Sequence, residues 1–394
     1  MAGGAITSPS QGRDAMPLGP REPRAWIDPI LALCAIALGG CSLVVIGGLP
    51  RDHSQMLHQA AYLGVGVILM AALARGDYSR LRELKWGLYV NLLVMIVAVI
   101  GAGHAISGTN STRSITFGGF SFQASEFGKV LLIVFLAGFV VDSSRKTSGR
   151  ELVARVMLLA LVPTMLVIAE PDLGSSLVYV AVAITILYIA GAAWQHLAAL
   201  AVLGVAAFVV VVAVLPALGV HALNTEVSRI TAFLHPSANP RSASWQQHQS
   251  TIAIGAGQKL GRGAATSQTS LGLVDAPTTD FIFASIGERF GFVGAAFVLS
   301  LYALIIWRTL RIIAAAKNLF GALIAAGVVA MLLFQVFVNV GVAVGILPVT
   351  GITLPLVSYG GSSVLTTFLA LGLLQSIHVQ ARVAAALKGR VLSI

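Results

Sequence analysis

The segment "FIFASIGERFGFVGAAFVLSLYALIIWR", residues 281–308, decides the class of the fold. It is longer than the roughly 20 residues that an α-helix needs to cross the hydrocarbon core of a membrane. Asp280 directly precedes it, and Glu288 and Arg289 lie inside it. An ionisable residue within a span costs roughly 2.5–3.5 kcal/mol on insertion scales. These side chains therefore need partners or a function.

The whole chain has the composition of this segment. Its 394 residues are 57% hydrophobic and 10% charged, with a mean hydropathy of +0.89, whereas soluble domains carry about 25% charged residues. The apolar runs are continuous rather than alternating, which argues against a β-barrel. We predict an all-α polytopic membrane protein with about ten transmembrane helices, near residues 26–48, 57–74, 84–104, 124–141, 152–169, 173–191, 195–216, 281–308, 318–344 and 357–380.

The net charge of +10 follows the predicted topology. With the N-terminus placed in the cytoplasm, 17 of the 25 Lys and Arg residues fall on the cytoplasmic side, as the positive-inside rule requires. They are Arg13, Arg21, Arg24, Arg75, Arg80, Arg82, Lys85, Arg145, Lys146, Arg150, Arg155, Arg308, Arg311, Lys317, Arg382, Lys388 and Arg390. We therefore predict that both termini are cytoplasmic and that no nucleic acid is a partner.

The chain divides into a tail and one membrane domain. Residues 1–24, rich in Gly, Pro, Ser and Arg, are predicted to be a disordered cytoplasmic tail. Residues 25–394 are predicted to form a single domain. Its large outer loop, about 217–280, joins helices seven and eight, and connections of this length are usually functional or disordered. Amphipathic pieces of this loop could lie along the membrane interface.

Small residues follow Asp280 at helical spacing. On a continuous helix, Ala284, Gly287, Gly291 and Gly294 would share its face. One interpretation is a packing seam of the small-xxx-small kind found in membrane bundles. The other is a groove for a lipid chain, beneath a polar head held at Asp280. The residues alone leave both open.

The segment "FQASEFGKV", residues 122–130, carries a second polar group. Ser125, Glu126 and Lys129 can lie near one face of a helix. They could form an intrahelical Glu–Lys pair with a Ser cap. Alternatively, with Arg113 of the preceding loop, they form a cationic cluster suited to a phosphate.

A glycine-rich basic loop, "AIGAGQKLGRG", spans residues 253–263. Such loops can cradle phosphates, and Lys259 and Arg262 would be the contacts, but the Walker spacing is absent. The alternative is a flexible loop. The eight histidines form no HxxxH or HExxH pattern, so we predict neither a histidine metal site nor an organic cofactor.

Five segments, in this order, resemble the SEDS family, the RodA and FtsW proteins of cell-wall synthesis. They are "TRSITFGGFSFQASEFGK" (112–129), "EPDLGSSL" (170–177), "QSTIAIGAGQKLGRG" (249–263), "TDFIFASIGERFGFVG" (279–294) and "GILPVTGITLPLVSYGGSS" (345–363). The segment "HPSANP", residues 235–240, is more similar to RodA than to FtsW. The chain departs from the family pattern at Ser114, Ala124, Gln258, Thr279 and Arg289.

The resemblance implies a peptidoglycan glycosyltransferase of the bacterial cytoplasmic membrane. Such enzymes polymerise lipid II, a disaccharide-pentapeptide on undecaprenyl pyrophosphate, at the outer face during elongation, division or sporulation. The implied partners are lipid II, membrane lipids and a class B penicillin-binding protein, which is a transpeptidase. The essential acid of the family maps onto Asp280. Alternative functions are a lipid II flippase or transporter, and a non-catalytic scaffold for the transpeptidase.

Asp280 is the candidate general base, which would remove the proton from the attacking sugar hydroxyl. Burial beside Phe281 and Phe283 could raise its pKa, and nearby cations would oppose that shift. In an alternative role Asp280 would hold a divalent cation, Mg²⁺ or Mn²⁺, which could also stabilise the leaving pyrophosphate. The expected substrate-binding residues are Arg113, Gln123, Ser125, Glu126, Lys129, Lys259, Arg262 and Ser358.

Overall fold

The computed structural model describes residues 27–48, 53–102, 114–117, 120–144, 146–209, 224–234, 243–263 and 276–391. The described residues are almost entirely helical, with one short antiparallel hairpin of β1 and β2. The elements are α1 (Pro29–Gly47), α2 (His53–Arg75), the 3-10 helix η1 (Tyr78–Arg82), α3 (Lys85–Ala102), β1 (Ile115–Phe117), β2 (Phe120–Phe122), α4 (Ala124–Ser143), α5 (Gly149–Ala169), α6 (Leu173–Ile189), α7 (Trp194–Val209), α9 (Asn224–Leu234), α10 (Ala243–Gly257), α11 (Ile282–Ala315), α12 (Leu319–Ala343) and α13 (Gly361–Val391).

The predicted all-α membrane class is confirmed. Each of the ten predicted ranges coincides with a helix, and seven helices of the described part are long and apolar enough to cross a membrane. The number of spans stays a prediction, because α3 and α6 are apolar but shorter. The predicted tail, residues 1–24, and parts of the predicted outer loop lie outside the described residues.

The C-terminal helix differs most from its predicted range of 357–380. It begins at Gly361 and continues to Val391. The start is later because the preceding residues form a turn, in which the Ser358 hydroxyl accepts a hydrogen bond from Leu354 N at 2.8 Å. The end is later because the helix continues through Arg382 and Lys388, beyond its apolar segment.

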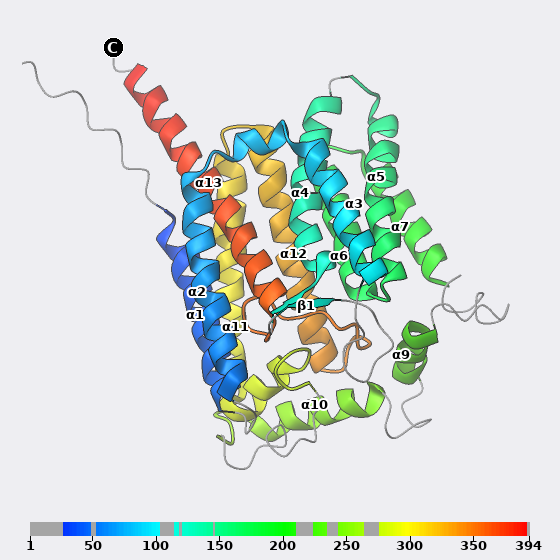
Figure 1. Cartoon of the computed structure of the whole chain (residues 1–394), viewed down its shortest axis with the longest axis vertical. Coiled ribbons are helices and arrows are strands. Elements are labelled where there is room, and N and C mark those ends of the chain that lie inside the picture. Colours follow the sequence, from blue (N-terminus) through cyan, green and yellow to red (C-terminus); the bar gives the residue numbers. More distant parts are fainter. Residues whose placement is uncertain are drawn as a thin grey trace, which may run out of the picture.

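The helices stand side by side in a bundle (Figure 1). Helix α10 lies across one end of it, and the C-terminal part of α13 projects from the opposite end (Figure 1). We call the first the α10 end. The N-terminus of α11 packs against α10 there, as their close contacts show.

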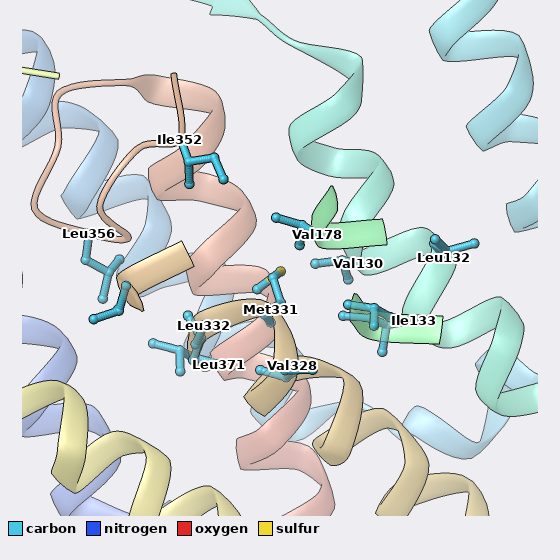
Figure 2. Packing of buried hydrophobic residues seen from close by; sticks show 14 of the residues in the cluster. Val130, Leu132, Ile133, Val178, Val328, Met331, Leu332, Ile352, Leu356 and Leu371 are labelled. Carbon is cyan, nitrogen blue, oxygen red and sulfur yellow. The ribbon is translucent and has the colours of Figure 1, made fainter. Parts of the chain in front are cut away.

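The core lies between α4, α6 and α12. Figure 2 shows Val130 and Ile133 of α4, Val178 of α6 and Met331 of α12 converging from their helices. These side chains are almost completely buried, as expected for helices that are hydrophobic on most of their surface. Helix α4 is therefore enclosed, and polar residues at its first turn are held in a fixed environment.

Candidate functional site

Asp280 lies in a turn that is fixed through its main chain. Four successive carbonyl groups, from Pro277 to Asp280, each accept a hydrogen bond from a different donor at 2.6–2.9 Å. In chain order the donors are the Ser285 hydroxyl, Tyr359 N, the Ser358 hydroxyl and the Asn339 amide. Asp280 as a whole is partly exposed, so this carbonyl clamp fixes the main chain of the residue without burying it completely.

The aromatic residues that follow Asp280 are buried. Phe281 and Phe283 are 1% and 4% exposed. Helix α11 begins two residues after Asp280, at Ile282. The positive end of the helix dipole therefore lies close to this residue.

Asn339 of α12 bonds to the turn that carries Asp280. Its side-chain nitrogen donates to Asp280 O at 2.9 Å and to Ile352 O at 2.7 Å. It is 1% exposed, so both carbonyls would lose their partner in a dry environment if the amide were removed. Asn339 thus ties the Asp280 turn to the segment before α13.

We expect Asn339→Asp to lower the kcat of glycan-strand synthesis, the activity that the family resemblance implies, about ten-fold or more with little change in KM. An ionised carboxylate cannot donate a hydrogen bond to these carbonyls, so the turn that carries Asp280 would shift. Steady-state kinetics of the purified variant measure this. The matched control is Gln335→Leu, one turn earlier on α12 and also buried, whose amide oxygen has no hydrogen-bond partner among the described residues. Equal kcat losses in both variants would contradict a positioning role for Asn339.

The first turn of α4 forms a second polar group with α6. Asp172 Oδ2 accepts hydrogen bonds from Ser125 Oγ at 2.9 Å and from Gln123 Nε2 at 3.1 Å. Its other oxygen caps α6 by accepting from Ser175 N at 3.0 Å. Ser125 therefore bonds to a neighbouring helix instead of capping its own. Sequence reasoning overlooked Asp172, although its position before "LGSSL" is typical of a helix N-cap.

Lys129 and Glu126 form a buried ion pair. The Lys129 Nζ to Glu126 Oε1 distance is 2.5 Å, and the two residues are 1% and 6% exposed. The intrahelical pair considered from sequence is therefore present. Breaking such a pair leaves an uncompensated buried charge, which costs about 3–5 kcal/mol. The role of Lys129 as a phosphate contact stays a prediction, and Arg113 lies outside the described residues.

The segment before α13, together with the first turn of that helix, joins the two polar groups. Ser362 Oγ accepts from Gln123 N at 3.0 Å and donates to Ser121 O at 2.6 Å, which connects it to the α4 side. Ser358, four residues earlier, bonds to the Asp280 turn. Because Ser358 is 1% exposed and its hydroxyl proton is used in the clamp, its position favours holding this turn over contacting substrate directly.

The glycine-rich loop packs against a break in α11. Gly291 has φ +65° and ψ −161°, which interrupts the helix between Phe290 and Phe292. The loop and this break exchange main-chain hydrogen bonds in both directions: Arg262 N to Glu288 O at 2.9 Å, and Phe292 N to Gln258 O at 2.8 Å. The N–H of Arg262 is thereby used within the protein and does not point at a ligand.

The prediction that Ala284, Gly287, Gly291 and Gly294 share one helical face with Asp280 is wrong, because α11 is interrupted at Gly291. Two of these glycines, Gly287 and Gly291, form a packing seam instead, whereas Gly294 lines an apolar groove between α1 and α11. A Cβ on Gly257 would lie 1.9 Å from Gly287 O, and one on Gly291 would lie 2.4 Å from Gly261 N. The two main chains therefore contact each other directly along this seam. Any side chain larger than that of glycine would hold them further apart.

The structure shows the local environment of two residues that depart from the family pattern, Gln258 and Arg289. Gln258 has φ +48°, a conformation that glycine adopts without cost. Arg289 is buried and donates from Nη1 to Val45 O at 2.8 Å. Its charge lies at the C-terminal end of α1, where the helix dipole favours a cation.

Lys259 and Arg262 follow shortly after the end of α10 at Gly257, and both are exposed. Neither forms an ion pair with a residue that the structure describes. Their ammonium and guanidinium groups are therefore available for an anionic ligand. Among the described residues no group of three or more His, Cys, Asp or Glu side chains is arranged to hold a metal ion.

The fold and this polar site define a multi-pass, all-α membrane protein with a partly exposed carboxylate at one end of the bundle. The family model described as "Cell cycle protein", which covers FtsW, RodA and SpoVE, matches residues 31–383. The chain belongs to this family, and the resemblance inferred from the five segments is confirmed.

Individual relatives extend over nearly the whole chain. Stage V sporulation protein E of Bacillus subtilis is 34% identical over 82% of this chain and 87% of the relative. Peptidoglycan glycosyltransferase MrdB of Escherichia coli is 35% identical over 90% and 94%. A solved chain from a peptidoglycan synthase complex that coordinates polymerization and crosslinking has a TM-score of 0.76 and 30% identity, and the alignment covers 90% of this chain and 98% of that one. These matches do not separate RodA-like from FtsW-like members, so that distinction stays a prediction.

Proposed function

We propose that this protein is a peptidoglycan glycosyltransferase that polymerises lipid II at the outer face of the cytoplasmic membrane. Family membership and the name of the E. coli relative support this class of activity. The observation that carries the proposal is the carbonyl clamp, which fixes the turn of Asp280 through Asn339 and Ser358 while the residue stays partly exposed.

In the proposed reaction Asp280 acts as general base. A hydroxyl of the acceptor sugar attacks the anomeric carbon of the donor, and its proton passes to the Asp280 carboxylate. The bond between the anomeric carbon and the donor pyrophosphate breaks, and its electron pair leaves with the pyrophosphate. Because the clamp acts on the main chain, the side chain needs little reorganisation to meet the hydroxyl.

Positive groups stabilise the leaving pyrophosphate in this proposal. Arg113 and Lys129 are the candidates on the α4 side, with Gln123, Ser125 and Glu126 orienting them. A divalent cation would add further charge stabilisation when bound. Mg²⁺ is commonly held by one or two carboxylates together with substrate phosphates, and the accessible Asp280 fits that donor set.

The proposed orientation places the α10 end outside, with both termini in the cytoplasm. It follows the Lys and Arg distribution and puts Asp280 at the outer boundary, where the sugar of a lipid-linked substrate would lie. The solved relative from a peptidoglycan synthase complex supports a transpeptidase partner. We therefore propose that a class B penicillin-binding protein pairs with this chain.

Reconstitution tests the proposed function. The purified protein, alone and with its transpeptidase, is supplied with lipid II and Mg²⁺ or Mn²⁺, and the products are separated by gel electrophoresis. We expect a ladder of glycan strands. Lipid II that crosses vesicle membranes without forming strands would instead identify a flippase. If the protein neither forms strands nor moves lipid II, but its binding increases the activity of the transpeptidase, it would be identified as a scaffold.

A further inference from the structure

An apolar groove of about 610 Å³ lies between α1 and α11, within the volume range of small-molecule sites. Its walls include Gly40 and Val44 of α1, and Phe290 and Phe297 of α11. Val44 is 60% and Phe297 53% exposed. Both helices have the length and hydropathy of membrane spans, so the groove opens toward lipid.

Cations gather at one end of this groove. Leu260 also lines it and lies between the exposed Lys259 and Arg262. The loop is fixed there because Val293 N, on the groove-lining part of α11, donates to Lys259 O at 3.2 Å. The buried Arg289 bonds to Val45, another lining residue, and its Nε has no partner in the described part of the protein.

We propose that this groove binds the polyprenyl chain of the acceptor substrate, with its pyrophosphate at Lys259 and Arg262. The proposal rests on the proposed function and names a subsite of it. An apolar groove that opens to lipid and ends at exposed cations complements a molecule with one hydrocarbon chain below an anionic phosphate head. Joining two lipid-linked sugars requires two such substrates to be bound at once.

The distance between Asp280 and the proposed phosphate site indicates which of the two substrates, acceptor or donor, this site would bind. The loop that carries Lys259 and Arg262 is bonded to α11 at Glu288, whose carbonyl accepts from Arg262 N at 2.9 Å. Glu288 lies eight residues after Asp280, which along a helix is about 12 Å. The donor breaks its bond to pyrophosphate, so its phosphate must lie beside the reacting carbon. In a linear strand the acceptor reacts at the sugar end away from its own pyrophosphate. A phosphate site about one disaccharide away from the base therefore suits the acceptor.

The chain offers a matched pair of variants. A Cβ on Gly40 or on Gly64 would meet no described atom within 4 Å, and both residues are exposed, so a larger side chain starts without obstruction at both positions. Gly40→Leu fills the groove, whereas Gly64→Leu places the same side chain on an exposed face of α2, which is absent from the groove lining. A third variant, Lys259→Ala with Arg262→Ala, removes the two exposed cations.

The experiment separates the two substrates. A lipid II analogue with a non-cleavable phosphonate at the anomeric carbon serves only as acceptor, and one with its distal hydroxyl capped serves only as donor. We expect Gly40→Leu and the double Ala variant each to raise KM for the acceptor analogue about ten-fold. An effect of this size corresponds to lost contact with about two methylene groups in the first variant, or to one lost charged hydrogen bond in the second. KM for the donor analogue, and both values in Gly64→Leu, should stay within about two-fold.

A photoreactive group near the pyrophosphate end of the acceptor's polyprenyl chain gives a second readout that needs no turnover. We expect mass spectrometry to locate cross-links on α1 and α11 in the wild type, and their loss in Gly40→Leu. An unchanged acceptor KM, or an equal rise for the donor, would overturn the proposal while leaving the glycosyltransferase function intact. Displacement of the cross-link by excess phosphatidylglycerol would also overturn it and identify a general phospholipid site. Absence of any product in the wild type would overturn the proposed function itself.

Discussion

The Asp280→Asn variant is expected to synthesise glycan strands about 10²–10⁴-fold more slowly than the wild type. The amide has nearly the shape of the carboxylate but cannot take the proton from the acceptor hydroxyl. Initial rates of lipid II consumption by the purified protein measure the effect. The clamp that holds this turn binds carbonyl groups of the main chain, so its hydrogen bonds survive the substitution.

The same variant separates chemistry from folding. Its free energy of unfolding should differ from the wild-type value by less than about 1 kcal/mol, as for substitutions outside the packed core. A full rate in Asp280→Asn would exclude a general base at this position. A large loss of stability would show that the carboxylate mainly supports the structure. A slow but stable protein is the result that the proposed mechanism requires.

Gly291→Ala is expected to destabilise the protein by about 2–6 kcal/mol. The φ and ψ angles of Gly291, +65° and −161°, belong to a region that is essentially restricted to glycine and costs other residues about 1–3 kcal/mol. The new Cβ would also lie 2.4 Å from Gly261 N and 2.6 Å from Leu260 N, and overpacking of this kind costs about 1–3 kcal/mol more. Because the obstructing atoms are main chain, no rotamer change relieves the contact.

Thermal or denaturant unfolding in detergent measures this loss, with Gly64→Ala as the control. Gly64 lies inside α2 with open space around its Cα, so alanine there should stabilise the helix by about 0.5–1 kcal/mol. Equal stability of the two variants would show that the break in α11 tolerates a side chain. The expected difference would instead identify the seam between α10 and α11 as a strict steric requirement.

Much of the architecture could be predicted from local properties of the chain. Hydropathy located every predicted helix, since a span needs only a sufficiently long apolar run. The cost of an ionisable group in such a run singled out Asp280 and the Lys129–Glu126 pair. The break at Gly291 could not be predicted in this way, because an isolated glycine inside an apolar segment is compatible with a continuous helix.

The sequence by itself determined the membrane class, the family and the candidate carboxylate, because each depends on composition, helical length or a contiguous motif. Only the tertiary structure decided what holds that carboxylate. Asn339 reaches Asp280 across 59 residues of chain, and Asp172 reaches Ser125 across 47. Hydrogen bonds between such distant residues leave no periodic pattern in the sequence. They form only after helix packing has excluded water and placed donor and acceptor within reach of each other.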